Sequence, residues 1–255
     1  MNKIHFADQG QGSVIVFLHG LCETHHIWKD YIKELSTTHR VIAPDLPGFG
    51  ESHFDRYDFS LDDIAKILKD FLSEELGLSS FSLIGHSLGG YITMSFAANY
   101  PEYLDSFGLY HSTAMDDSPE KKEKRAQAIA QVKDKGIDSF LDGFVPGLFA
   151  PDNKDKMKDK VDELRKICGE STEASFIAYS KAMKTRNDNT HVLKQFNKPM
   201  FIIAGDQDPS VPLRHAIIQS KLSDKIRLKV LQNTGHVGMY EAPNEAMAFV
   251  KSFFA

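Results

Sequence analysis

The chain of 255 residues is long enough for one large hydrophobic core with a modest insertion, or for two small domains. Its 42% hydrophobic and 25% charged residues are typical of an ordinary globular protein, and its net charge of −5 argues against nucleic acid or an anionic membrane as a partner. The longest apolar runs, such as residues 14–18, are far too short to cross a bilayer.

Two features of the sequence concern the cellular compartment. The N-terminal residues lead into a polar stretch and not into the apolar segment of a secretory signal. The two cysteines, Cys22 and Cys168, are too few for a disulfide framework, and reduced thiols are the simplest account of them. We therefore expect a cytoplasmic protein.

Apolar runs alternate with amphipathic segments over the first 113 residues. The runs are typical of buried strands, and the segments between them carry apolar residues on one helical face. Thr24 and Ser60 are the expected N-caps of two helices. The expected strands are 4–6, 14–18, 41–43, 81–84 and 107–110, and the expected helices are 24–35, 61–72 and one that begins at Leu88.

The alternation stops between Ala114 and His191, where helical patterns follow one another with no strand between them. Ser118 and Pro119 form a preferred helix start, a capping serine followed by proline at the first position. The expected helices are about 119–135, 137–148, 154–168 and 172–184. We call residues 114–191 the cap segment and predict that it is a helical lid inserted into a core of residues 1–113 and 192–255.

The strand pattern returns at residues 199–204 and is followed by a helix over 212–222, a strand over 226–231 and a closing helix over about 243–254. Strands that are apolar throughout and alternate with amphipathic helices indicate a mostly parallel sheet covered on both faces. The expected fold class is therefore α/β. In such a sheet, functional groups gather in the loops beyond the carboxyl ends of the strands.

One of these loops contains the pattern Gly85-x-Ser87-x-Gly89. Such a short pattern occurs by chance in many chains, but here a buried strand precedes it and a helix follows it, which is the context that the chemistry requires. The glycines are needed because a Cβ at either position would collide with the neighbouring strand or helix. The turn would lift the hydroxyl of Ser87 clear of the sheet, at the positive end of the helix, which predicts a nucleophilic serine.

A serine hydroxyl needs a base to take its proton, and the base needs a carboxylate that fixes its tautomer. His236, in the loop after the last strand, is the favoured base, and His111 after the strand at 107–110 is a weaker rival. Asp208 and Asp206 both follow the strand at 199–204. Asp208 is favoured because it precedes a proline-rich turn that projects a side chain, whereas Asp206 could instead bond to backbone amides.

The other histidines have different expected roles. His86 adjoins Ser87, but consecutive residues at a sharp turn point apart, so His86 is expected to orient the turn. His19 precedes Gly20 and is expected to shape a loop. Six further histidines are expected to lie at the surface: His25, His26, His39, His53, His191 and His215.

Five motifs, in this order along nearly the whole chain, resemble the α/β-hydrolase superfamily. They are His19-Gly20, Asp45-Leu46-Pro47-Gly48-Phe49-Gly50-Glu51-Ser52, Gly85-His86-Ser87-Leu88-Gly89-Gly90, Gly205-Asp206-Gln207-Asp208 and Gly235-His236. The resemblance implies the α/β-hydrolase fold and a triad of Ser87, Asp208 and His236, since the acid of similar proteins is the last aspartate of the Gly-x-x-Asp stretch. It also implies an oxyanion hole formed by the backbone N–H groups of Leu21 and Leu88.

The type of nucleophile narrows the chemistry. Haloalkane dehalogenases and epoxide hydrolases of this fold use aspartate where this chain has Ser87, which argues against both activities. A serine favours acyl transfer: Ser87 attacks an ester carbonyl, His236 protonates the leaving alcohol, and water later releases the acid. No cofactor and no metal ion is expected for this reaction.

The cap segment lies in sequence between the strand that follows the Ser87 unit and the strand that precedes Asp208, so it is expected to cover Ser87. Its aromatic and aliphatic side chains could line an acyl pocket, or could only pack the segment onto the core. They suggest a small-molecule substrate, a small to medium ester or lactone. The candidate substrate contacts are Phe144, Leu148, Phe149, His111 and Val237.

Other functions are compatible with the same residues. One is hydrolysis of carbon–carbon bonds, or a cofactor-free perhydrolase reaction, by the same triad. Another is a ligand receptor that keeps the triad and signals through movement of the cap segment, as some members of the superfamily do. Ester turnover that is lost in Ser87→Ala favours an enzyme, and binding without turnover favours a receptor. The oligomeric state is not predicted.

Overall fold

A seven-stranded sheet forms the centre of the computed structural model, which describes residues 3–255. Its strand order is β1-β3-β2-β4-β5-β6-β7, and all neighbours are parallel except β1, which pairs antiparallel with β3. The predicted α/β class with a mostly parallel sheet is confirmed. The strands are β1 (Phe6–Gln9), β2 (Val14–Leu18), β3 (Arg40–Pro44), β4 (Phe81–His86), β5 (Leu104–Tyr110), β6 (Met200–Gly205) and β7 (Ile226–Leu231).

The first strand lies further along the chain than predicted. We expected it at residues 4–6, but β1 pairs Phe6 with Pro44 and Gln9 with Val41 at the edge of the sheet. An edge strand is hydrogen-bonded on one side only, and the residues of β1 are half-buried or exposed. Its position therefore depends on pairing with β3 and not on an apolar run that the sequence could display.

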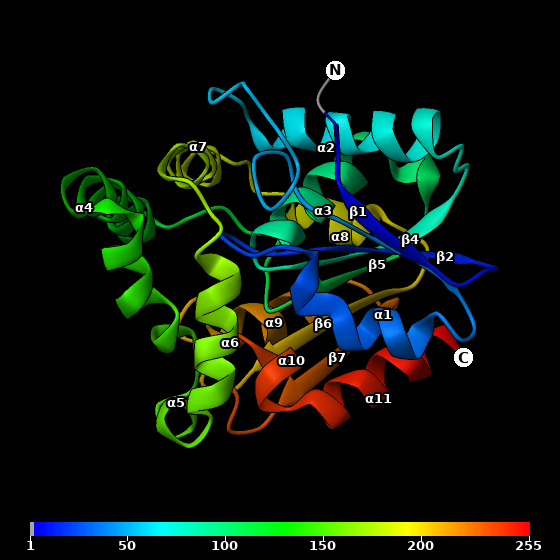
Figure 1. Ribbon diagram of the computed structural model, residues 1–255. Coiled ribbons are helices and arrows are strands. Elements are labelled where there is room, and N and C mark those ends of the chain that lie inside the picture. Colours follow the sequence, from blue (N-terminus) through cyan, green and yellow to red (C-terminus); the bar gives the residue numbers. More distant parts are fainter. Residues whose placement is uncertain (1–2) are drawn as a thin grey trace.

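Helices cover both faces of the sheet (Figure 1). On one side α1 and α11 lie next to each other, and Lys251 of α11 pairs with Glu34 of α1. On the other side α2 packs against α3, and α3 against α8. The helices that accompany the sheet are η1 (His25–Trp28), α1 (Lys29–Leu35), α2 (Leu61–Asp70), η2 (Phe71–Glu75), α3 (Leu88–Asn99), η3 (Pro101–Tyr103), α8 (Thr190–Gln195), α9 (Leu213–Ser220), α10 (Gly238–Glu241) and α11 (Pro243–Phe254).

The predicted helix starts are confirmed by their capping bonds. Ser60 accepts from the N–H of Asp63 at 3.1 Å, and the Asp63 carboxylate accepts from the N–H of Ser60 at 2.8 Å, which forms a capping box. The side chains of Thr24 and Ser118 each accept one backbone N–H, from His26 and Lys121, and so cap η1 and the first helix of the cap segment. The short helix α10 was not predicted. Among residues 3–255, no helix is both long and apolar enough to cross a bilayer.

The cap segment contributes a group of helices at one end of the sheet (Figure 1). The first of them is interrupted at Gly136, whose φ of 80° is not helical, so the predicted break between residues 135 and 137 is confirmed. The predicted helix over 154–168 is divided at Met157. The helices are α4 (Pro119–Phe144), η4 (Pro146–Leu148), α5 (Asn153–Lys156), α6 (Lys158–Cys168) and α7 (Glu173–Lys184).

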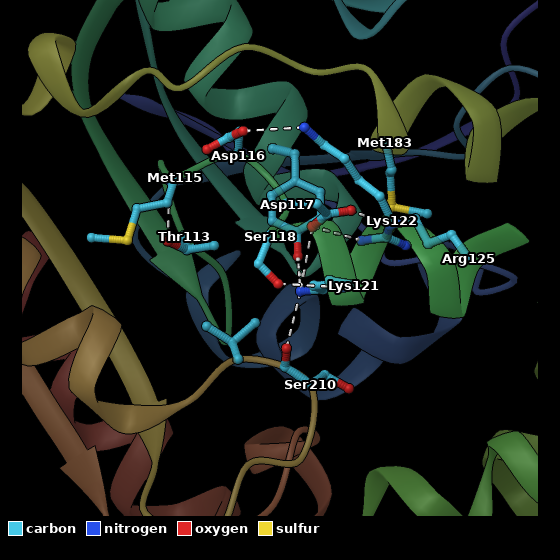
Figure 2. A network of polar contacts seen from close by, with 12 residues as sticks. Thr113, Met115, Asp116, Asp117, Ser118, Lys121, Lys122, Arg125, Met183 and Ser210 are labelled. Atoms are coloured by element: carbon cyan, nitrogen blue, oxygen red, sulfur yellow. Dashed lines mark hydrogen bonds and ion pairs between the residues drawn. The ribbon is translucent and has the colours of Figure 1, made fainter.

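A buried carboxylate holds the beginning of the cap segment (Figure 2). The side chain of Asp117 is fully buried and forms ion pairs with Arg125, Lys121 and, at 2.7 Å, Arg186. Although burial favours the neutral acid, the hydrogen bond from Arg125 and the nearby positive charges keep the pKa of Asp117 below its usual value. Lys121 also donates to the carbonyl oxygen of Ser210 at 3.0 Å, so α4 is bonded to the loop that follows Asp208.

The glycines of the Ser87 turn give a test of the fold. A Cβ on Gly85 would lie 2.2 Å from the carbonyl carbon and oxygen of Gly89, and backbone atoms in a packed turn cannot move aside. We expect Gly85→Ala to lower the free energy of unfolding by about 3 kcal/mol or more, measured by urea denaturation.

The control is Gly143→Ala in α4, where an added Cβ would have nothing within 4 Å. This substitution is expected to raise the free energy of unfolding by roughly 0.5–1 kcal/mol, because alanine favours the helix. A Gly85→Ala variant as stable as the wild type would contradict the close approach of β4 and α3.

Candidate active site

Ser87 occupies a strained turn between β4 and α3. Its φ of 50° and ψ of −112° are rare for a residue with a Cβ. Two hydrogen bonds hold the turn: the N–H of Ser87 donates to the carbonyl of Tyr110 at 3.0 Å, and the Ser112 hydroxyl donates to the carbonyl of Ser87 at 2.7 Å. The Ser87 hydroxyl makes no capping bond to α3, so it is free to bond to another loop.

That bond is made to His236, from the loop after β7. His236 Nε2 lies 2.8 Å from Ser87 Oγ, and His236 Nδ1 lies 2.8 Å and 3.0 Å from the two carboxylate oxygens of Asp208. Because an ionised carboxylate only accepts, the proton of the neutral imidazole belongs on Nδ1, and Nε2 can accept the proton of Ser87. The structure thus brings together the three side chains that the sequence predicts as a triad.

Four donors surround the carboxylate of Asp208. Besides His236, its oxygens accept from the N–H groups of Ser210 and Val211, both at 2.8 Å, and from Nδ1 of His111 at 3.1 Å. Burial favours the neutral acid, but the charge of His236 and the hydrogen bonds from the two histidines hold the pKa of Asp208 well below its usual value. Asp208 is therefore ionised at neutral pH.

Asp206, the alternative acid, faces the backbone of a neighbouring loop. Its carboxylate accepts the N–H of Thr234 at 3.1 Å, which is the structural role that the sequence left open for it. This bond joins the loop after β6 to the loop that carries His236. Among the hydrogen bonds of residues 3–255, none links Asp206 to the imidazole of His236. The geometry therefore favours Asp208 over Asp206.

His111 does not have the place that the sequence suggested for it. It is fully buried, donates from Nδ1 to Asp208 and accepts the N–H of Gly238 at Nε2 at 3.2 Å. Both nitrogens are thus occupied by protein groups, and His111 can neither serve as the base for Ser87 nor expose its ring to a substrate. Burial lowers the pKa of His111 to about 4, although Asp208 opposes the shift, so the ring is neutral at pH 7.

The loop after β2 carries the first proposed oxyanion donor. Within residues 3–255 the N–H groups of Leu21 and Leu88 form no hydrogen bond to another protein group, and their role as oxyanion donors stays a prediction. The preceding N–H, that of Gly20, donates to Glu23 Oε2 at 2.6 Å. Cys22 in the same loop is fully buried, and burial raises the pKa of its thiol to about 12, which leaves it protonated and unreactive.

The cap segment touches the loop that carries His236. The carbonyl of Leu148 accepts the N–H of His236 at 2.7 Å. The Glu241 carboxylate accepts the N–H groups of Gly235 at 2.9 Å and Ala150 at 2.8 Å, and it also accepts from the Asn153 side chain at 2.8 Å. A single acidic side chain of α10 thus binds both the loop of the base and the cap segment.

The remaining candidate substrate contacts are mostly covered. Leu148, Phe149 and Val237 are 4%, 3% and 0% exposed, so little of their surface could touch a ligand in this conformation. Phe144 is half-buried and stacks on Phe140 with ring centroids 5.0 Å apart. Their role as substrate contacts stays a prediction.

Two groups of side chains within residues 3–255 have the composition of a metal site. One is the trio His111, Asp208 and His236 described above, and the other is His5, His25 and Asp45. In the second group the Asp45 oxygens lie 2.8 Å from His25 Nδ1 and 3.1 Å from His5 Nδ1. Ordinary hydrogen bonds from imidazole N–H groups to a carboxylate account for these distances in both groups.

The histidines expected at the surface are only partly exposed. His26, His53 and His191 are exposed as predicted, whereas His39 and His215 are half-buried. The prediction was wrong for His25, because only 11% of its side chain is exposed and it bonds to the buried Asp45. The sequence showed an amphipathic helix here but not the loop after β3 that covers it.

Sequence reasoning did not single out Glu23, Ser112 or Glu241, which all bond to the loops of the site. Ser112 and Glu241 carry no signal, because no motif of neighbouring residues marks the bonds of Ser112 to Ser87 or of Glu241 to Gly235, Ala150 and Asn153. Glu23 offered one: it is an acidic residue in the short loop Leu21-Cys22-Glu23 directly after a buried strand. A carboxylate there must find a partner when it is buried.

The family model of the alpha/beta hydrolase fold matches residues 13–243, and the chain therefore belongs to the α/β-hydrolase family. It is similar to an uncharacterized protein of Mycobacterium tuberculosis (strain ATCC 25618 / H37Rv), with 24% identity over 97% of this chain and 77% of that protein. Among solved structures it is similar to a thermophilic esterase from Thermogutta terrifontis, with a TM-score of 0.92, 26% identity, and 98% and 92% of the two chains covered.

The enol-lactonase from Burkholderia xenovorans LB400 is also similar, with a TM-score of 0.90 and 18% identity over 99% of this chain and 96% of that chain. At this identity the likeness shows the fold alone. The α/β-hydrolase fold predicted from the motifs is confirmed by the family match and by these structures.

The buried His111 predicts how stability depends on pH. An unfolded histidine titrates near pH 6.5 but folded His111 only near pH 4, so the unfolded state binds this proton first as the pH falls. Because of His111, the free energy of unfolding should fall by on the order of 2–3 kcal/mol when the pH is lowered from 7 to 4.5. Urea denaturation at both pH values should show a smaller loss in His111→Gln, and the exposed His53→Gln should behave as the wild type. Equal losses in all three proteins would contradict a neutral, buried His111.

Proposed function

We propose that this chain is a serine hydrolase that cleaves a small to medium carboxylic ester or lactone through an acyl-enzyme intermediate. The observation that carries this proposal is the hydrogen-bonded series from Ser87 Oγ to His236 and on to Asp208, with distances of 2.8 Å at both steps. A serine in a strained turn with a base in contact is the arrangement that nucleophilic catalysis requires.

In the first half of the reaction, Ser87 Oγ forms a bond to the carbonyl carbon while its proton moves to His236 Nε2. The carbonyl oxygen becomes an oxyanion and accepts the N–H groups of Leu21 and Leu88, each worth about 3–4 kcal/mol in the transition state. When the bond to the leaving oxygen breaks, His236 gives its proton to the departing alcohol. Asp208 stays ionised and stabilises the imidazolium in between.

In the second half, water attacks the acyl group on Ser87. His236 takes a proton from the water and returns it to Ser87 Oγ as the carboxylic acid leaves. For a lactone, the alcohol and the acid remain parts of one opened product. The residues of this chain supply every proton transfer that the reaction needs.

The cap segment is proposed as a lid over Ser87. Support comes from its hydrogen bonds to loops at the carboxyl ends of the strands: Leu148 to His236, and Ser171 to the carbonyl of Cys22 at 3.0 Å. Phe144, Leu148 and Phe149 are the proposed acyl contacts. The similarity to a thermophilic esterase supports an ester as the substrate class.

The test is a panel of p-nitrophenyl esters from acetate to octanoate, simple lactones and vinylogous diketones, assayed with wild type and Ser87→Ala. We expect ester or lactone turnover that falls at least about 10⁴-fold in Ser87→Ala, since a triad acts as a unit. Ser80→Ala, at an exposed serine before β4, is the matched control and should keep full activity.

The panel also separates the alternatives. Turnover of diketones without esters would replace the proposal by carbon–carbon bond hydrolysis. Saturable binding without turnover would replace it by a receptor function. Ester turnover that survives in Ser87→Ala would refute Ser87 as the nucleophile.

A further inference from the structure

His86 and Glu23 face each other beneath the Ser87 turn. His86 is the last residue of β4 and directly precedes Ser87, whereas Glu23 lies in the loop after β2. Their side chains are only 1% and 3% exposed. His86 Nδ1 lies 2.8 Å from Glu23 Oε2, and His86 Nε2 lies 2.9 Å from the carbonyl oxygen of His236.

Both nitrogens of His86 thus face oxygen atoms that serve as acceptors. Nε2 must carry a proton to bond to the carbonyl of His236. The second proton lies between Nδ1 and Glu23 Oε2, and because Oε2 also accepts the N–H of Gly20 at 2.6 Å, negative charge is stabilised there. The proton therefore belongs to Nδ1, and the ring is an imidazolium.

The electrostatics of the two groups agree with this assignment. Burial opposes the charged form of each, but the charge and hydrogen bond of Glu23 raise the pKa of His86. In the same way, the charge and hydrogen bond of His86 lower the pKa of Glu23 against the effect of burial. The rings of Trp28 and Tyr110, 6.4 Å and 6.2 Å away, cover other sides of the imidazolium.

The pair connects three loops that the proposed reaction needs. Glu23 holds Gly20, which precedes the oxyanion donor Leu21. A Cβ on Gly20 would lie 2.7 Å from Glu23 Oε2 and 2.8 Å from His86 Nδ1, so only glycine allows this contact. On its other side His86 holds the main chain of the base His236.

We propose that Glu23 and His86 are positioning residues, a buried ion pair that sets the Leu21 amide and the His236 imidazole relative to Ser87. The part of this proposal that concerns catalysis rests on the proposed function. Neither residue touches the reacting atoms. Each acts through a backbone group, Glu23 through the N–H of Gly20 and His86 through the carbonyl of His236.

An amide cannot replace the carboxylate of Glu23 in this network. In Glu23→Gln, one atom must occupy the position next to both Gly20 N–H and His86 Nδ1. If it is the amide nitrogen, it confronts the N–H of Gly20. If it is the oxygen, a neutral His86 that donates from Nδ1 has no proton left for the carbonyl of His236.

The first measurement is the ¹⁵N NMR spectrum of histidine-labelled wild-type protein at pH 7–8, assigned with His86→Gln. We expect two protonated ring nitrogens on His86 in the wild type and one in Glu23→Gln. A single protonated nitrogen on His86 in the wild type would overturn the ion pair. This readout does not depend on turnover, so it stands even if the proposed function fails.

The second measurement is the steady-state kinetics of p-nitrophenyl acetate hydrolysis. In Glu23→Gln we expect kcat to fall about 10–100-fold with little change in KM. Glu102→Gln, at an exposed acid, is the control and should match the wild type. A folded Glu23→Gln variant with the wild-type kcat would reduce the pair to a structural contact and overturn the positioning role.

The kinetic test needs a replacement in two cases, a Glu23→Gln variant that does not fold and a wild type that hydrolyses no ester. If Glu23→Gln does not fold, as thermal melting would show, His86→Gln takes its place with the same expected fall in kcat. If the wild type hydrolyses no ester, the rate at which a fluorophosphonate labels Ser87 is compared between wild type and variant instead. An unchanged labelling rate would then overturn the proposal independently of the substrate.

Discussion

The contact between the backbones of Gly85 and Gly89 determines where Ser87 lies. An added Cβ on Gly85 would be 2.2 Å from the carbonyl of Gly89, so β4 and α3 meet at a distance that only glycine permits. The chain passes this junction with Ser87 at a φ of 50°, and bonds to Tyr110 and Ser112 stabilise the turn. From this position Ser87 reaches His236, 149 residues away in the sequence, with a hydrogen bond of 2.8 Å.

Three loops of the site are bonded to the cap segment as well as to the core. Lys121 binds the loop after Asp208, Leu148 binds the main chain of His236, and Ser171 binds the carbonyl of Cys22 beside Leu21 (Figure 2 shows the first of these contacts). Each of these bonds involves a main-chain group of one of the three loops. They therefore hold the cap segment in one arrangement relative to these loops.

Much of this arrangement could be predicted because its signals are local. The apolar runs, the capping residues Ser60 and Ser118 and the Gly-x-Ser-x-Gly turn depend on neighbours within a few positions. They located every strand except β1, two helix starts and Ser87. The role of His111 could not be predicted, because its place behind Asp208 depends on the packing of β5 against β6. The same holds for Glu23 and for the burial of His25, whose partners lie on other strands or loops.

The central claim is that His236 makes the Ser87 hydroxyl a nucleophile. A fluorophosphonate tests it directly, because an activated serine oxygen forms a bond to phosphorus and releases fluoride. The account predicts one adduct per chain by intact mass, located on the Ser87 peptide, and labelling at least about 100-fold slower in His236→Ala. No adduct, an adduct on another residue, or equal rates in the two proteins would contradict it.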